Sequence, residues 1–75
     1  MKKTLRSNGI YFNTYNIYDD NNKLKGLLEI HNVDVKKEYF IAWCNLKPFC
    51  GSYKGKTKHF ENEVEAINEI LKNEV

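Results

Sequence analysis

Apolar and polar positions alternate along two stretches of the chain, a third stretch is apolar on both faces, and all three are predicted to be β-strands. The stretches are residues 10–18, 23–32 and 38–46. Residues 19–22, between the first two, are Asp-Asp-Asn-Asn, a run of turn formers, so we expect an antiparallel hairpin there. The third stretch is apolar on both faces, which is typical of a central strand. Pro48 should end it, because proline cannot donate a hydrogen bond to a strand ladder.

Towards the C-terminus the apolar residues recur at helical spacing instead. The predicted apolar stripe of this helix comprises Val64, Ala66, Ile67, Ile70 and Leu71. Asn62 is a good N-cap, and the glutamates of the first turn favour the positive end of the helix dipole. We expect a helix from about Glu63 to Asn73 whose stripe covers one face of the sheet.

Residues 56–60 are predicted to form a short fourth strand at the sheet edge, after a turn or loop over residues 51–55. The expected fold class is therefore α+β, with an antiparallel three- or four-stranded sheet and one C-terminal helix packed across one face. A chain of 75 residues makes a single domain, residues 1–75, with a small core. The other face of the sheet is expected to stay uncovered.

Charge is divided unevenly along the chain. Residues 1–60 carry eleven Lys or Arg against five acids, a net of +6, whereas residues 61–75 carry one Lys against five Glu, a net of −4. The most basic segment, residues 47–59, has four lysines, two aromatic residues and no acid. Separated charge of this kind bears on partners and on their encounter, and it says little about fold.

Three patterns that would indicate catalysis or ligand binding are incomplete. Residues 51–57 resemble a phosphate-binding loop but have three residues between the glycines, where the motif needs four. Cys44 and Cys50 have five residues between them and the histidines are scattered, whereas structural zinc sites use closely spaced pairs. A Cys50 nucleophile has no recognisable third group to orient its base. We therefore expect no metal, no cofactor and no enzymatic activity.

The composition predicts a soluble protein of the cytoplasm. The N-terminal residues lack the apolar segment of a signal peptide, and the longest apolar run, residues 39–44, is too short to cross a membrane. Two cysteines are too few for a disulfide scaffold. Many Asn, Lys and Ile with few Ala are usual in AT-rich genomes, including those of phages and mobile elements. For a phage protein the compartment is the host cytoplasm.

The basic segment supplies the candidate binding residues. Lysines provide charges for phosphates or acidic surfaces, and aromatic rings provide stacking or anchoring. We expect the uncovered sheet face to contribute Tyr11, Tyr15, Lys25 and His31 as well. The predicted partner-binding residues are Lys47, Phe49, Tyr53, Lys54, Lys56, Lys58, Tyr11, Tyr15 and Lys25. The alternative, in which these lysines only keep the surface soluble, stays open.

Two functions are consistent with these features. In the first, the protein is a non-enzymatic inhibitor or adaptor that binds another protein, itself one that handles nucleic acid, such as a host-defence complex. In the second, the segment 47–59 and the uncovered sheet face bind nucleic acid directly. Arginine, the usual residue for bidentate contacts with bases, is scarce, which counts against sequence-specific DNA readout. No membrane and no small-molecule substrate are expected.

The element order and the start of the helix, Phe60-x-Asn62-x3-Ala66, carry a general resemblance. Three antiparallel strands followed by a helix resemble the small DNA-arm-binding domains of phage-type integrases. The resemblance implies a sheet that lies in the major groove. It transfers no functional residue, since it rests on element order and on no specific motif.

Overall fold

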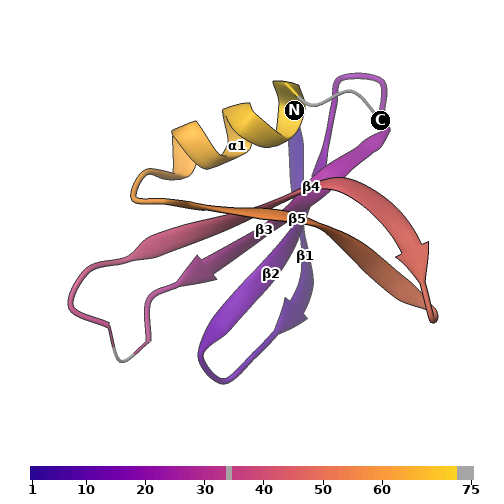
Figure 1. Ribbon diagram of the computed structural model, residues 1–75. Helices are drawn as coiled ribbons and strands as arrows, with labels where there is room; N and C mark the ends of the chain where they lie inside the picture. The colour runs from indigo at the N-terminus through magenta and orange to yellow at the C-terminus, as the bar shows by residue number, and fades with distance from the viewer. Residues whose placement is uncertain (34, 73–75) are drawn as a thin grey trace.

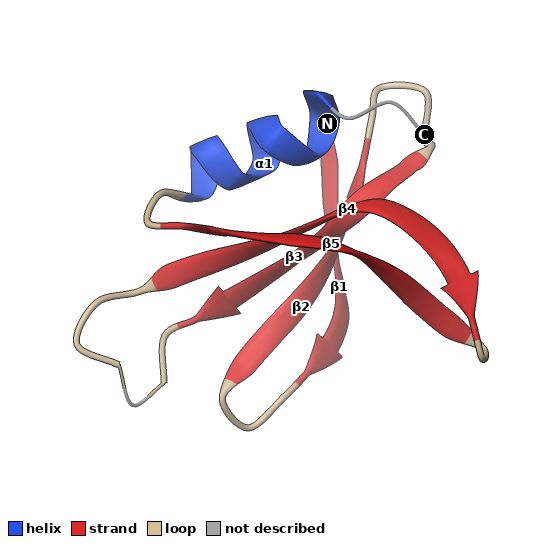
Figure 2. Ribbon diagram, viewed as in Figure 1, coloured by secondary structure: helices blue, strands red, loops and turns tan. Residues whose placement is uncertain are grey.

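Each strand pairs with the strand that follows it in the sequence. The computed structural model describes residues 1–33 and 35–72. Its elements are, in order, β1 (Lys2–Asn8), β2 (Phe12–Tyr18), β3 (Leu24–His31), β4 (Tyr39–Phe49), β5 (Ser52–Phe60) and α1 (Glu63–Lys72) (Figures 1 and 2). The five strands form one antiparallel sheet in the order β1-β2-β3-β4-β5.

The α+β class and the C-terminal helix on an antiparallel sheet are confirmed, but the sheet has five strands and not three or four. The strand that the pattern missed is β1, which pairs with β2. All its residues except Thr4 are exposed at the sheet edge, so apolar and polar positions do not alternate along it. Backbone hydrogen bonds to β2, and not burial, hold this segment extended.

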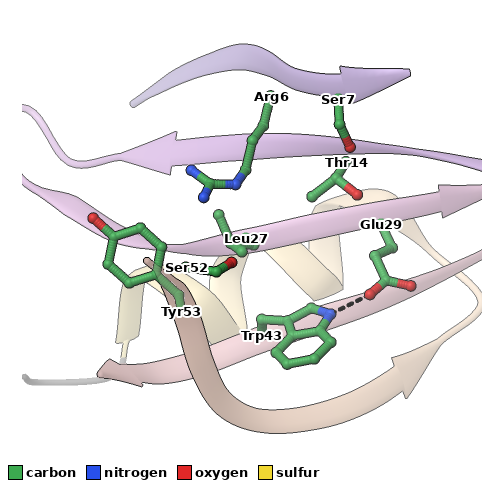
Figure 3. Close-up of a pocket in the computed structure, with 8 residues that line it drawn as sticks. All are labelled: Arg6, Ser7, Thr14, Leu27, Glu29, Trp43, Ser52 and Tyr53. Carbon is green, nitrogen blue, oxygen red and sulfur yellow. Dashed lines mark hydrogen bonds between the residues drawn. The ribbon is translucent and has the colours of Figure 1, made fainter. Parts of the chain in front are cut away.

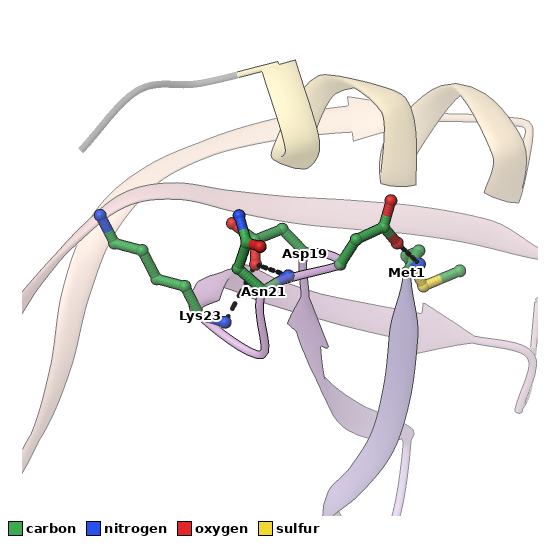
Figure 4. Close-up of polar contacts among 5 residues, drawn as sticks. Met1, Asp19, Asn21 and Lys23 are labelled. Carbon is green, nitrogen blue, oxygen red and sulfur yellow. Dashed lines mark hydrogen bonds and ion pairs between the residues drawn. The ribbon is translucent and has the colours of Figure 1, made fainter.

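The predicted hairpin between β2 and β3 is present. Its turn is held by a carboxylate of Asp19, which accepts hydrogen bonds from the backbone N–H groups of Lys23 (3.0 Å) and Asn21 (2.8 Å) (Figure 4). These hydrogen bonds hold the pKa of Asp19 below its usual value, and the bond from Lys23 has the larger effect. Asn22 has a left-handed φ of 62°, which asparagine tolerates better than most residues. The polar residues of this turn therefore have a structural role.

β4 and β5 extend as a hairpin beyond the rest of the sheet. The last pair between β3 and β4 is Leu27–Trp43, whereas β4 and β5 remain paired up to their turn. We call residues 44–56 the wing. The prediction that Pro48 ends the strand is wrong, because Pro48 lies inside β4. β4 has no β3 neighbour at that position, so the missing N–H of the proline is not needed there.

A β-bulge bends the wing away from the helix (Figure 1). Asn45 and Leu46 both lie opposite Gly55, and Asn45 has a left-handed φ of 53°. A Cβ atom added to Gly55 would lie 2.5 Å from the carbonyl oxygen of Cys44, so the bulge requires glycine at this position. At the tip, residues 50 and 51 have φ of 46° and 79°, the geometry of a two-residue primed hairpin turn.

The helix covers one face of the sheet (Figure 2). The core between the helix and the sheet consists of Ile17, Leu28, Phe40, Ala42, Cys44, Ala66 and Ile70. Ile70 lies so close above Gly26 that an added Cβ would be 2.6 Å from Ile70 Cγ2. Val64 was predicted to lie in the buried stripe but is 65% exposed, because the helix rests on Ala66 and Ile70. Asn73, the predicted last helical residue, lies outside the described residues.

Candidate functional site

Four of the predicted binding residues come together on the wing. Lys47 and Lys54 lie directly opposite each other in the β4–β5 register, and Lys56 follows on the same side of β5. The ammonium group of Lys54 lies 5.3 Å from the ring centroid of Phe49, which is itself 56% exposed. We call these four residues the basic cluster. Lys56 pairs with the buried Cys44, so the cluster lies on the side of the sheet that carries α1.

Three other predicted residues lie away from the wing. Tyr15 was expected on the uncovered face, and this expectation is wrong: it pairs with Leu28 and packs against the core under the helix. Tyr11 lies between β1 and β2 and is 62% exposed. Lys25 lines a shallow depression beside Asp19 at the other end of the sheet. The predicted residues therefore do not form one continuous surface.

Two ion pairs among the described residues join the acidic helix to the basic strands. Lys58 Nζ lies 2.8 Å from Glu69 Oε1, and Lys3 Nζ lies 2.9 Å from Glu63 Oε1. The hydrogen bond from Lys58 lowers the pKa of Glu69, and Glu69 raises the pKa of Lys58. Lys58, a predicted binding residue, is therefore engaged by the helix. The lysines of the basic cluster form no ion pair with another described residue.

The sheet face without the helix is concave and partly enclosed. A second β-bulge lies in β1, where the register shifts between Leu5 and Ser7 and leaves Arg6 as the additional residue. Across this face the edge strands β1 and β5 approach each other through their long side chains. The guanidinium carbon of Arg6 lies 5.1 Å from the ring centroid of Tyr53. Tyr53, predicted to act with the lysines, thus lies on the opposite face of the wing from them.

A cleft of about 200 Å³ occupies this concavity, and all five strands contribute to its lining (Figure 3). Leu27 is 7% and Glu29 is 9% exposed, although the helix lies on the other face. Trp43 Nε1 donates a hydrogen bond to Glu29 Oε2. Glu29 Oε1 lies 2.8 Å from Nε2 of His31. The buried carboxylate therefore fixes the indole ring at one side of the cleft.

A row of stacked rings continues the concave face beyond the cleft. The centroids are 4.4 Å apart for Phe12 and His31, 4.5 Å for His31 and Tyr39, and 4.7 Å for Tyr39 and His59. The rings face one another across four strands, so their π-faces are used mainly within the row. Such a row presents ring edges to solvent, and nucleic-acid bases need ring faces for stacking.

The cleft was not predicted from the sequence. Its lining includes Arg6, the only arginine of the chain, and Trp43, the only tryptophan. The sequence feature that could have pointed to the cleft is the single arginine in a lysine-rich chain. Its strand was not recognised, however, and the local pattern does not show that β1 approaches β5.

No family model, no curated protein and no solved structure matches the chain. The five-stranded sheet also departs from the three-strand order on which the resemblance to integrase arm-binding domains rests. Within the described part of the chain, no three His, Cys, Asp or Glu side chains converge to hold a metal ion. Within the same residues, no helix has the length and hydrophobicity that crossing a bilayer requires. Cys44 and Cys50 are free thiols, and burial raises the pKa of Cys44.

Proposed function

We propose that the protein is a small non-enzymatic binding module whose basic cluster engages an acidic surface of a partner protein. In this role it acts as an inhibitor or adaptor of a protein that handles nucleic acid, in the cytoplasm of a cell that harbours a phage or mobile element. The lysines steer the encounter, and the exposed ring of Phe49 supplies an apolar anchor. The composition, rich in Asn, Lys and Ile, supports the phage or mobile-element origin.

The opposition of Lys47 and Lys54 carries this proposal. Like charges directly opposite each other destabilise a strand pair, and these two residues are register partners. Neither ammonium group has a carboxylate partner among the described residues, and Lys56 adds a third charge on the same side. Carboxylates of a partner would offset the repulsion. The pair does not help the protein to fold, but it would then have a role in binding.

The test compares two double variants with the same change of charge. Lys47→Gln/Lys54→Gln removes the opposed pair, and Lys23→Gln/Lys36→Gln removes two exposed lysines outside the wing. Each protein is immobilised and used to capture partners from nuclease-treated host lysate. We expect one specific protein to be retained by the wild type and the control, and its capture by the Lys47/Lys54 variant to fall about tenfold or more.

Thermal denaturation supplies the second readout for these variants. Removing the opposed charges should leave the free energy of unfolding unchanged or higher, because the pair is repulsive. Equal capture by the two double variants would refute the role of the basic cluster.

Direct binding of nucleic acid is the second candidate function. It is favoured by Lys54 and Lys56, which follow each other on one side of an exposed edge strand and can neutralise neighbouring phosphates. Such binding must weaken with salt, with a log–log slope of about 0.9 for each phosphate contacted on a duplex. Fluorescence anisotropy of a labelled oligonucleotide between about 50 and 200 mM salt measures this slope. Absence of binding at the lower salt concentration eliminates this candidate.

A further inference from the structure

The lining of the cleft on the concave face includes the only arginine of the chain, and its guanidinium contacts two neighbouring side chains. Arg6 Nη1 donates to Asn16 Oδ1 (3.3 Å), and Asn16 Nδ2 donates to Thr4 Oγ1 (3.3 Å). The guanidinium carbon of Arg6 lies over the ring of Tyr53. Among the described residues these contacts engage one of the five N–H donors of the arginine. A guanidinium held in this way is suited to bind an oxyanion through two parallel hydrogen bonds.

Polar and aromatic groups complete the lining of the cleft. Its hydroxyl-bearing residues are Ser7, Thr14, Ser52 and Tyr53. Trp43 and Tyr53 contribute ring surface, and Leu27 forms an apolar floor between Arg6 and Trp43 (Figure 3). Hydroxyl groups add donors for an oxyanion, while rings and apolar carbon favour a flat group beside it.

The two ends of the cleft differ in charge. Figure 3 shows the guanidinium of Arg6 at one end and the carboxylate of Glu29 at the other. Glu29 Oε2 accepts a hydrogen bond from Trp43, and Oε1 lies 2.8 Å from His31 Nε2. A carboxylate has about four acceptor sites, so further donors can still be accommodated. A complementary ligand therefore has an oxyanion at one end, N–H donors at the other and a flat ring between them.

The size of the cleft limits the ligand to one small unit. Its volume of about 200 Å³ lies below the roughly 300–1,000 Å³ of pockets that enclose drug-sized molecules. A nucleotide joins a phosphate to a flat base with N–H donors, and its sugar can remain at the open mouth. We propose that the cleft binds the phosphate and base of one nucleotide, either a free nucleoside monophosphate or the phosphorylated end of a strand.

In this arrangement the phosphate lies on Arg6 and the base lies over Leu27 against Trp43 and Tyr53. The site is independent of the basic cluster, because the lysines lie on the opposite face of the wing. The nucleotide site can therefore be tested separately from the proposed function, because variants on one face of the wing should affect nucleotide binding and variants on the other should affect binding of the partner protein.

The indole N–H of Trp43 provides a direct reporter, since it gives the only tryptophan side-chain signal of the chain in a ¹H–¹⁵N spectrum. The folded ¹⁵N-labelled protein is titrated with AMP, GMP, CMP and UMP, with the matching nucleosides, and with inorganic phosphate. We expect at least one monophosphate to shift the indole signal in a saturable manner, and its nucleoside to bind about tenfold or more weakly. Absence of a shift with every monophosphate, or equal shifts with nucleosides, would overturn the proposal.

Variants identify the group that binds the phosphate. Arg6→Gln should weaken monophosphate binding roughly ten- to a hundredfold, because a hydrogen-bonded charge partner is lost. Lys23→Gln, an exposed lysine outside both the cleft and the basic cluster, is the matched control and should bind like the wild type. If Arg6→Gln is unfolded, Ser7→Asp serves instead, because Ser7 is an exposed residue of the cleft lining and its carboxylate should repel the phosphate. Unchanged binding by the folded Arg6→Gln or Ser7→Asp variant contradicts the assignment.

A final comparison separates the two sources of the nucleotide. Short single-stranded oligonucleotides with and without a 5′-phosphate are titrated in the same way, beside a dipeptide with a free carboxylate and an aromatic side chain. A shift with phosphorylated oligonucleotides and free monophosphates supports the end of a strand, and a shift with monophosphates alone supports the free nucleotide. A tighter response to the dipeptide overturns the proposal in favour of a peptide site.

Discussion

Small residues determine how closely the layers of this protein approach each other. Gly26 lies directly beneath Ile70, where an added Cβ would be 2.6 Å from the isoleucine side chain and 2.4 Å from the carbonyl oxygen of Trp43. Ile70 itself is fully buried, as is Ala66 one helical turn earlier. The helical pattern gave equal weight to Val64 and Ile67, but the first is exposed and the second only half-buried. Burial at this scale follows from the line along which the helix touches the sheet.

Ile70→Ala tests this assignment. Truncating a fully buried isoleucine should lower the free energy of unfolding by roughly 2–5 kcal/mol, because a cavity remains above Gly26. Ile67→Ala is the matched control and should cost clearly less, since its side chain is partly exposed at the rim of the core. Urea denaturation of both variants measures the difference. Equal losses would show that the helix contacts the sheet along a broader line.

At the scale of the elements, bulges shape the sheet more than strand length does. The bulge at Asn45 turns the wing toward the concave face, and the bulge at Arg6 turns β1 toward the wing. Both lie in edge pairs of the sheet, where a bulge disturbs the fewest hydrogen bonds. The contact between Arg6 and Tyr53 joins the first and last strands of the sheet.

Gly55→Ala should disturb this geometry. The added methyl group would lie 2.5 Å from the backbone oxygen of Cys44, and backbone cannot yield as a flexible side chain does. We expect a loss of roughly 1–3 kcal/mol, typical of overpacking, together with weaker contact between the wing and β1. Gly51→Asn is the control in the same hairpin, because asparagine tolerates the left-handed φ of 79° and nothing lies within 4 Å of an added Cβ. Chemical denaturation compares them, and equal stability would contradict the tight fit of the bulge.

At the scale of the whole molecule, the separated charges of the sequence are brought together. The acidic helix lies beside lysines of both edge strands, through the pairs Lys3–Glu63 and Lys58–Glu69. Within the segment 47–59, the lysines without an ion pair to another described residue are Lys47, Lys54 and Lys56, all of them on the wing. This arrangement narrows the predicted binding surface to the basic cluster, while the concave face presents a different chemistry.

The pairing of Glu69 predicts a pH dependence of stability. Its pKa is lower in the folded protein, chiefly through the hydrogen bond from Lys58, so the pair stabilises the fold above the unfolded pKa. This contribution is lost as the pH falls through the folded pKa. We expect the difference in Tm between the wild type and Glu69→Gln to be largest near neutral pH and to shrink below about pH 4.

Glu65→Gln, an exposed residue of the same helix, is the control for this experiment. Its Tm difference from the wild type should stay small and vary little over the same range. A Glu69→Gln difference that persists unchanged at low pH would show that the ion pair does not contribute to stability.

The local pattern of apolar, polar and turn-forming residues was sufficient to predict the elements that bury one face. The hairpin at residues 19–22 and the N-cap at Asn62 follow from turn chemistry and helix-start signals. β4 is an interior strand, in agreement with its two apolar faces, but the predicted central position belongs to β3. Asn62 Oδ1 accepts hydrogen bonds from the backbone N–H groups of Val64 and Glu65, as an N-cap should. These features depend on residues a few positions apart, so a single sequence carries enough information for them.

The sequence by itself determined the α+β class, the order of its main elements and the chemical character of the wing. Only the tertiary structure decided that β1 joins the sheet, that Tyr15 lies under the helix and that Tyr53 faces away from the lysines. It also decided that Arg6 and Trp43, 37 positions apart, line one cleft. The physical reason is that a bulge adds one residue to a strand, and every side chain after it then points to the opposite face of the sheet. The local pattern of apolar and polar residues does not show where such a bulge occurs.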